Sequence, residues 1–128
     1  MEARFVGLAL FALCLSCVAS SAGDLPWYGR EYQQCNDGST QAIVECVDEL
    51  VKKWDGRLNS AYKKLMDSET GDQRDRLRTA QRLWVQFRDA NCDYYAFGEG
   101  TISRIESVEC MRMLTKERAE ELEQALTP

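Results

Sequence analysis

The sequence predicts an all-α fold of two long antiparallel helices and a third C-terminal helix, joined by disulfides. Three segments carry apolar residues at spacings of three and four, the period of an amphipathic helix. No segment shows the alternation of a strand over a useful length, and there is no internal repeat or low-complexity stretch. We therefore expect one helical domain, with the first two long helices packed on each other and the third lying across them.

The N-terminal segment has the pattern of a secretory signal peptide. The basic residue Arg4 precedes an apolar run at residues 5–18, and small residues follow up to Ala22. We expect residues 1–22 to be removed and residues 23–128 to form the mature domain. The apolar run is too short to span a bilayer, which argues against a permanent membrane span.

Lipid attachment at Cys17 is the alternative processing route for this segment. Cleavage before Cys17 would tether the protein to a membrane. However, Cys14 stands where a lipidation signal usually has Leu or Val. We therefore expect a periplasmic or secreted protein without a lipid anchor.

Four cysteines remain in the expected mature domain: Cys35, Cys46, Cys92 and Cys110. An even number in a small exported domain indicates disulfides, and four cysteines allow three pairings. Loop closure favours Cys35–Cys46 and Cys92–Cys110, because each pair brackets one short connection. A four-cysteine zinc site is disfavoured because the chain lacks C-x-x-C pairs, so no metal is expected.

A loop with one short helical turn is expected at residues 24–38, followed by the first long helix. Ser39 or Thr40 can cap that helix. Its apolar positions are Ile43, Val47, Leu50, Trp54, Leu58, Ala61 and Leu65. The sequence "DSETGD" should end it.

The second helix is expected to run from Gly71 or Asp72 to about Phe97, where Gly98 is placed to cap it. One side of it carries Leu77, Ala80, Gln81, Leu83, Trp84, Val85, Phe87, Arg88, Asn91, Cys92 and Tyr95. We expect this side to face the core. The third helix should extend from about Arg104 to Leu126, with Val108, Met111, Leu114, Ala119 and Leu122 as its apolar positions.

Composition excludes several kinds of function. The chain has no histidine, so Ser-His-Asp and Cys-His nucleophiles and histidine-bound zinc are impossible. It has no phosphate-binding loop or dinucleotide fingerprint, and no glutamate lies on an apolar face that would raise its pKa for glycosidase-type catalysis. The net charge of −5 disfavours nucleic acid and suits a basic protein partner. We expect a binding protein without cofactor, not an enzyme.

Two features are candidates for a functional site. The first is a polar set on the three helices, expected to meet as one hydrogen-bonded network around a buried Arg88. Its members are Asn59, Tyr62, Gln81, Arg88, Thr115 and Arg118. The network would either set the register of the helices or form a ligand site. The second feature is the loop "FGEGTIS" at residues 97–103, whose acidic tip at residues 98–101 has Glu99 between Gly98 and Gly100 and ends at Thr101. A Cys92–Cys110 bridge would hold both ends of the loop, so that Glu99 could contact a partner's cleft.

These positions together resemble a protein family. The segments "LNSAY", "AQRLWVQFRDANC", "GEGT" and "CMRMLTKERAEEL", with the early pair Cys35 and Cys46, are similar to the LprI-type lysozyme-inhibitor N-terminal family of bacterial exported proteins. The resemblance covers nearly all of the expected mature chain. It implies a small secreted or lipid-anchored helical domain with disulfides, and a protein partner such as lysozyme. A non-inhibitory envelope adaptor, or an immunity protein for another toxin, is the alternative function.

Overall fold

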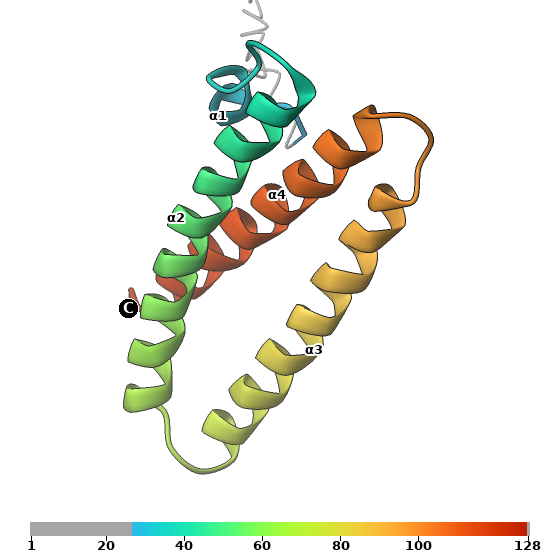
Figure 1. The fold of residues 1–128 in the computed structure, drawn as a ribbon. Coiled ribbons are helices and arrows are strands. Elements are labelled where there is room, and N and C mark those ends of the chain that lie inside the picture. Colours follow the sequence, from blue (N-terminus) through green and yellow to red (C-terminus); the bar gives the residue numbers. More distant parts are fainter. Residues whose placement is uncertain (1–26, 128) are drawn as a thin grey trace, which may run out of the picture.

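The structure, a computed structural model, describes residues 27–127, and these form four helices (Figure 1). The helices are α1 (Arg30–Gln33), α2 (Thr40–Ser68), α3 (Gly71–Ala96) and α4 (Ile102–Ala125). No strand occurs in the described residues, which confirms the all-α class. The expected signal peptide and Cys17 lie outside these residues. Within residues 27–127, no helix is both long and apolar enough to cross a membrane.

The ends of the long helices follow from local chemistry. Ser39 caps α2, and its Oγ accepts a hydrogen bond of 3.2 Å from the backbone N–H of Ala42. A short extended turn follows Ser68, and α3 begins at Gly71, whose φ of +54° lies in the left-handed region that glycine adopts easily. At the other end of α3, Phe97 occupies the cap position and Gly100, not Gly98, takes a left-handed conformation.

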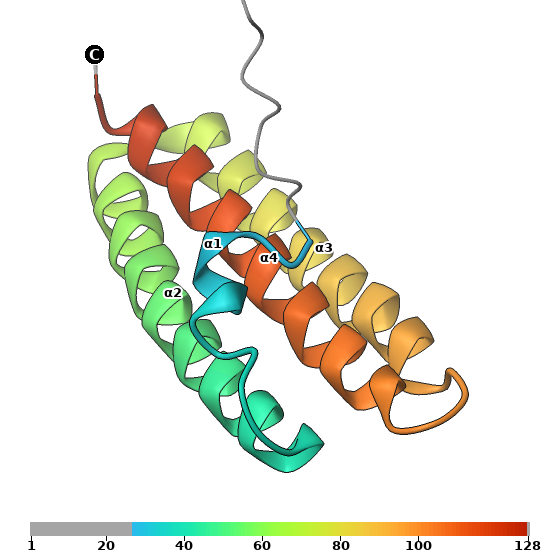
Figure 2. The ribbon, with the colours of Figure 1, turned by 90° about the horizontal axis from the view of Figure 1, so that it is seen from above.

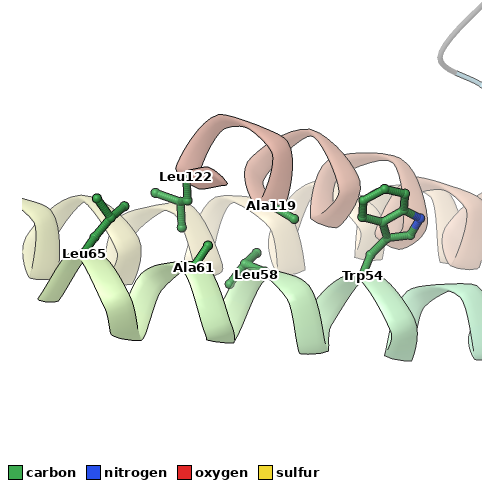
Figure 3. Packing of buried hydrophobic residues seen from close by; sticks show 6 residues of the cluster. All are labelled: Trp54, Leu58, Ala61, Leu65, Ala119 and Leu122. Carbon is green, nitrogen blue, oxygen red and sulfur yellow. The ribbon is translucent and has the colours of Figure 1, made fainter. Parts of the chain in front are cut away.

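The central helix of the fold is α4, which corrects the expected packing. α2 and α3 run antiparallel from their shared turn but diverge, while α4 packs along both of them (Figures 1 and 2). The main core joins α2 to α4 through Trp54, Leu58, Ala61, Leu65, Ala119 and Leu122 (Figure 3). Because the apolar face of α2 is used against α4, little of it is left to contact α3.

A second core fixes α1 at the other end of α2. It contains Tyr32 and Cys35, which pack against Ile43 and Val47 of α2 and Ile105 of α4. The Cys35–Cys46 disulfide ties this region to α2. The second disulfide, Cys92–Cys110, ties α3 to α4. Both bridges are those favoured by loop closure, so the predicted pairing is confirmed.

Candidate functional site

The two most deeply buried charges of the described residues, Glu109 and Arg112, form an ion-pair cluster with the partly exposed Glu31. Glu109 is fully buried, and the Arg112 side chain is 3% exposed. Arg112 donates from Nε to Glu109 Oε2 at 2.7 Å and from Nη2 to Glu109 Oε1 at 2.6 Å. Its Nη1 donates to Glu31 Oε2 at 2.9 Å. The two bonds to Glu109 neutralise that carboxylate inside the fold, and the bond to Glu31 links α4 to α1.

Two neutral N–H groups donate further hydrogen bonds to the carboxylates of the cluster. The indole Nε1 of Trp54 donates to Glu31 Oε2 at 2.9 Å, and the backbone N–H of Tyr28 donates to Glu109 Oε1 at 2.9 Å. Tyr28 holds a left-handed backbone with φ of 56°, which is uncommon for a residue with a side chain. The cluster therefore joins the start of the described chain to α2 and α4. Because the cluster lies inside the fold and its charges are paired and hydrogen-bonded, it suits a structural role and not a reactive one.

The polar set predicted from the sequence is only partly brought together. Arg118 Nε donates to Gln81 Oε1 at 3.1 Å, which joins α4 to α3. Asn59 is exposed and its amide donates to Asp55 at 2.9 Å, while Tyr62 is half-buried against the main core. Asn59 lies on α2 and Gln81 on α3, and these two helices diverge. Asn59 and Gln81 therefore take part in separate contacts.

The remaining two members of the polar set are also separate from the Gln81–Arg118 pair. The hydroxyl of Thr115 is buried and has no hydrogen-bond partner among residues 27–127. Arg88 donates from Nε to Asp89 Oδ1 at 2.9 Å and lies 5.0 Å from the centre of the Trp84 ring. Arg118 itself lines a groove of about 410 Å³ at the end of the fold where α2 ends, α3 begins and α4 ends. The structure thus replaces the expected central Arg88 with Arg112.

The acidic loop, residues 98–101, connects α3 to α4 and projects from one end of the fold (Figure 1). Gly98, Glu99, Gly100 and Thr101 are all exposed. Ser103 Oγ donates to the carbonyl of Gly100 at 2.8 Å, which closes the turn into α4. The Cys92–Cys110 disulfide joins the two helices that carry the loop. Glu99 is therefore presented to solvent on a short loop with both ends held.

A comparison with protein families now adds to this geometry. The profile of the family described as lysozyme inhibitor LprI matches residues 32–122. The chain belongs to the LprI family. No curated protein matches the chain, and no solved structure matches it either. The LprI match runs from α1 to the last turns of α4, and it includes all four bridged cysteines, the acidic loop, Glu109 and Arg112.

Sequence reasoning missed the ion-pair cluster of this LprI-family domain, although a pattern for it exists. Glu109 and Arg112 are three residues apart and continue the spacing of Ile105 along one face of α4. Opposite charges at that spacing on an otherwise buried face indicate an internal ion pair. The partner Glu31 could not be inferred from the helix pattern, because it is 81 residues away from Arg112.

Among residues 27–127, no group of three or more His, Cys, Asp or Glu side chains is arranged to hold a metal ion. Burial alone would lower the pKa of Arg112, but the hydrogen bonds and charge of Glu109, together with Glu31, outweigh burial and raise that pKa. The carboxylates of Glu31 and Glu109 in this LprI-family domain are thus held by a permanent cation.

The cluster also predicts how stability responds to alkaline pH. Burial, and then the negative charge of Glu109, raise the pKa of Tyr32 above its ordinary value. Since the folded state favours the neutral phenol, this contribution to stability is complete below pH about 10 and is lost as the pH rises through the folded pKa. We expect the free energy of unfolding to fall above that pH, and to fall less steeply in Tyr32→Phe. Urea denaturation at a series of pH values measures both slopes.

Proposed function

We propose that this protein inhibits lysozyme by direct protein–protein contact, with the acidic loop, residues 98–101, as part of the contact surface. The observation that carries the proposal is the match of residues 32–122 to the lysozyme inhibitor LprI family. A family of inhibitors acts by binding, which agrees with a chain that has no histidine. The proposal therefore needs an accessible surface and not a reactive centre.

Charge favours this choice of partner. The chain carries a net charge of −5, whereas lysozymes are often strongly basic, so long-range attraction would steer the two proteins together. The loop end of the fold is itself acidic: Asp93 and Glu99 are exposed and Glu106 is partly exposed. An acidic end of this kind would raise the association rate more than the final affinity.

The position of Glu99 within such a complex follows from the chemistry of the target. Lysozyme cleaves its substrate with two carboxyl groups in the cleft. A third carboxylate placed between them would be repelled unless a cation or a protonated acid received it. We therefore place Glu99 at the rim of the cleft, where basic side chains of lysozyme can pair with it. The short loop would cover the entrance and exclude the glycan.

The disulfides bear on where the protein works. Cys35–Cys46 and Cys92–Cys110 are both formed, and disulfides persist in oxidising compartments outside the cytoplasm. We propose the periplasm or the extracellular space, reached through a signal peptide at residues 1–22. This is the side of the cell envelope on which lysozyme meets peptidoglycan.

A cell-wall lysis assay tests the proposed function. The protein, purified after expression of the full chain, is expected to slow lysis by lysozyme at micromolar concentrations. Glu99→Lys should raise the half-inhibitory concentration about tenfold, because it replaces an attractive rim contact worth about 1–2 kcal/mol by a repulsive one. Glu117→Lys changes the net charge equally at an exposed position of α4 and should have a much smaller effect.

The assay distinguishes two questions: whether the protein inhibits lysozyme, and whether the acidic loop is part of the inhibitory surface. If the wild-type protein leaves the lysis rate unchanged for several types of lysozyme, the proposed function is wrong, and an envelope adaptor or an immunity protein for another toxin takes its place. If the wild-type protein inhibits but Glu99→Lys and Glu117→Lys behave alike, the inhibitory surface lies elsewhere on the fold.

A further inference from the structure

Helix α3 has a second apolar face that the rest of the fold leaves uncovered. Its inner face packs toward α4 through Gln81 and Cys92, which are buried, and through the partly buried Leu77 and Trp84. A different set of residues forms a continuous exposed line along the helix, here named the α3 stripe: Ala80, Leu83, Phe87, Ala90, Tyr94 and Phe97. A helix with two apolar faces is built to contact two partners.

The exposure of the α3 stripe is large for such residues. Leu83 is 55% exposed, Phe87 56%, Tyr94 75% and Phe97 89%. The described surface has only one other large apolar residue exposed to a comparable degree, Ile102 at 50%. Exposed apolar side chains scattered singly need no explanation, but four that follow one line on one helix mark an interaction surface.

The spacing of the α3 stripe is that of a coiled coil. Its members follow one another at intervals of three, four, three, four and three residues, which is the 3.5-residue period of the a and d positions. From Ala80 to Phe97 the stripe spans about 26 Å of helix at 1.5 Å per residue. This pattern selects another helix of similar length as the partner.

We propose that the α3 stripe binds the same stripe of a second copy of this chain, with the two α3 helices antiparallel. Placing the two-fold axis between residues 88 and 89 sets Phe87 opposite Ala90 of the second copy, Leu83 opposite Tyr94, and Ala80 opposite Phe97. Every a position then faces a d position, as an antiparallel coiled coil requires. The register follows because the intervals of the stripe, three, four, three, four and three residues, are the same in both directions along the helix.

Side-chain size supports this register. Phe87 and Phe97 are two large rings of the stripe, and each faces an alanine of the second copy. The two-fold axis repeats these contacts, so that a Phe87–Ala90 contact lies on each side of the axis. Large side chains opposite small ones let two helices interdigitate without voids. A shallow depression surrounds Ala80 and is lined in part by Arg76, Thr79 and Leu83. This depression lies where the proposed register places Phe97 of the second copy.

Charge supports the antiparallel direction. Arg82 and Asp93 flank the α3 stripe on the same exposed side of the helix. In the antiparallel register, Arg82 of each copy lies about 3 Å along the axis from the level of Asp93 of the other copy. In a parallel pair the two-fold axis runs along the helices, so Asp93 of one copy and Arg82 of the other would lie on opposite sides of the seam and could not pair. The antiparallel pair also places the two acidic loops at opposite ends, away from each other.

Sedimentation equilibrium tests whether the pair forms. The protein purified after expression of the full chain is expected to be a dimer at micromolar concentrations. Phe87→Glu, at an exposed position, should weaken dimerisation more than about tenfold, because it sets charge into a closed apolar layer. The circular dichroism spectrum of Phe87→Glu, and the melting temperature of its monomer, should match those of the wild type. Ser60→Glu adds the same charge on the exposed side of α2 and should leave the dimer intact. A wild-type protein that stays monomeric, or a Phe87→Glu variant that dimerises like the wild type, would overturn the proposal.

A charge exchange tests the register. Arg82→Asp alone sets two acids near each other at both ends of the pair, and Asp93→Arg alone sets two arginines together. Each variant should dimerise more weakly than the wild type, while an equal mixture of the two should form mixed dimers in which both contacts are restored. Isotope-labelled mixtures analysed by native mass spectrometry report the mixed species. A mixture that forms no excess of mixed dimers contradicts the antiparallel register.

Discussion

Replacing Arg112 by methionine is expected to lower the free energy of unfolding by about 3–5 kcal/mol, because the change leaves a buried carboxylate without its cation. Glu109 is fully buried and receives two hydrogen bonds from Arg112, at 2.7 and 2.6 Å. Once Arg112 is removed, the backbone N–H of Tyr28, at 2.9 Å, is the one donor to Glu109 left among residues 27–127. Urea denaturation followed by circular dichroism measures the loss.

Two variants make this prediction specific. Arg88→Met is expected to cost only about 1 kcal/mol, because both of its acidic partners, Asp89 and Asp55, are exposed to solvent, and its contact with the Trp84 ring adds little. Combining Glu109→Leu with Arg112→Met should recover most of the loss, since an apolar pair needs no counter-charge. If Arg88→Met were as destabilising as Arg112→Met, the assignment of Arg112 as the central cation would be wrong.

Removal of the Cys92–Cys110 bridge should affect both stability and inhibition. The bridge closes a loop of 18 residues, so changing both cysteines to alanine is expected to lower the free energy of unfolding by about 3 kcal/mol. The same change frees the ends of α3 and α4 that carry the acidic loop. The loop must then be ordered when lysozyme binds, which weakens the inhibition of lysis.

The other disulfide is the matched control for this experiment. Cys35–Cys46 closes a similar loop, with a sequence separation of 11, but it joins the α1 region to α2, and neither of these carries the acidic loop. Changing both of these cysteines to alanine should cost a comparable amount of stability and leave the half-inhibitory concentration nearly unchanged at a temperature where both variants are folded. If both variants lose inhibition equally, the Cys92–Cys110 bridge has no specific role in holding the loop for binding.

Several parts of the fold could be predicted from local sequence because they depend on near neighbours. The start of α2 follows from Ser39, whose side chain bonds a backbone group three residues away. The turn before α3 follows from Gly71 and the polar residues around it. The disulfide pairing followed from loop length, since Cys35 and Cys46, like Cys92 and Cys110, are close along the chain.

The candidate site was predicted less completely, because its contacts are distant in sequence. Residues 98–101 stood out as an acidic glycine loop, and the structure places them exposed between two bridged helices. The buried guanidinium was assigned to Arg88, which shares an arc with apolar residues of α3. However, burial of a charge depends on its partners, and the partners of Arg112 include Glu31 on α1.

The sequence by itself determined which residues share a helical face, where the helices begin and end, and which cysteines join, because each of these properties depends on helical period or short loop closure. Only the tertiary structure decided which partner each face meets. On α3 the period placed Leu83 and Phe87 in one arc with Gln81 and Cys92, yet Leu83 and Phe87 point to solvent while Gln81 and Cys92 are buried. The reason is that α4, which is far from α2 along the chain, covers the apolar face of α2 and leaves α3 with one face packed and one face open.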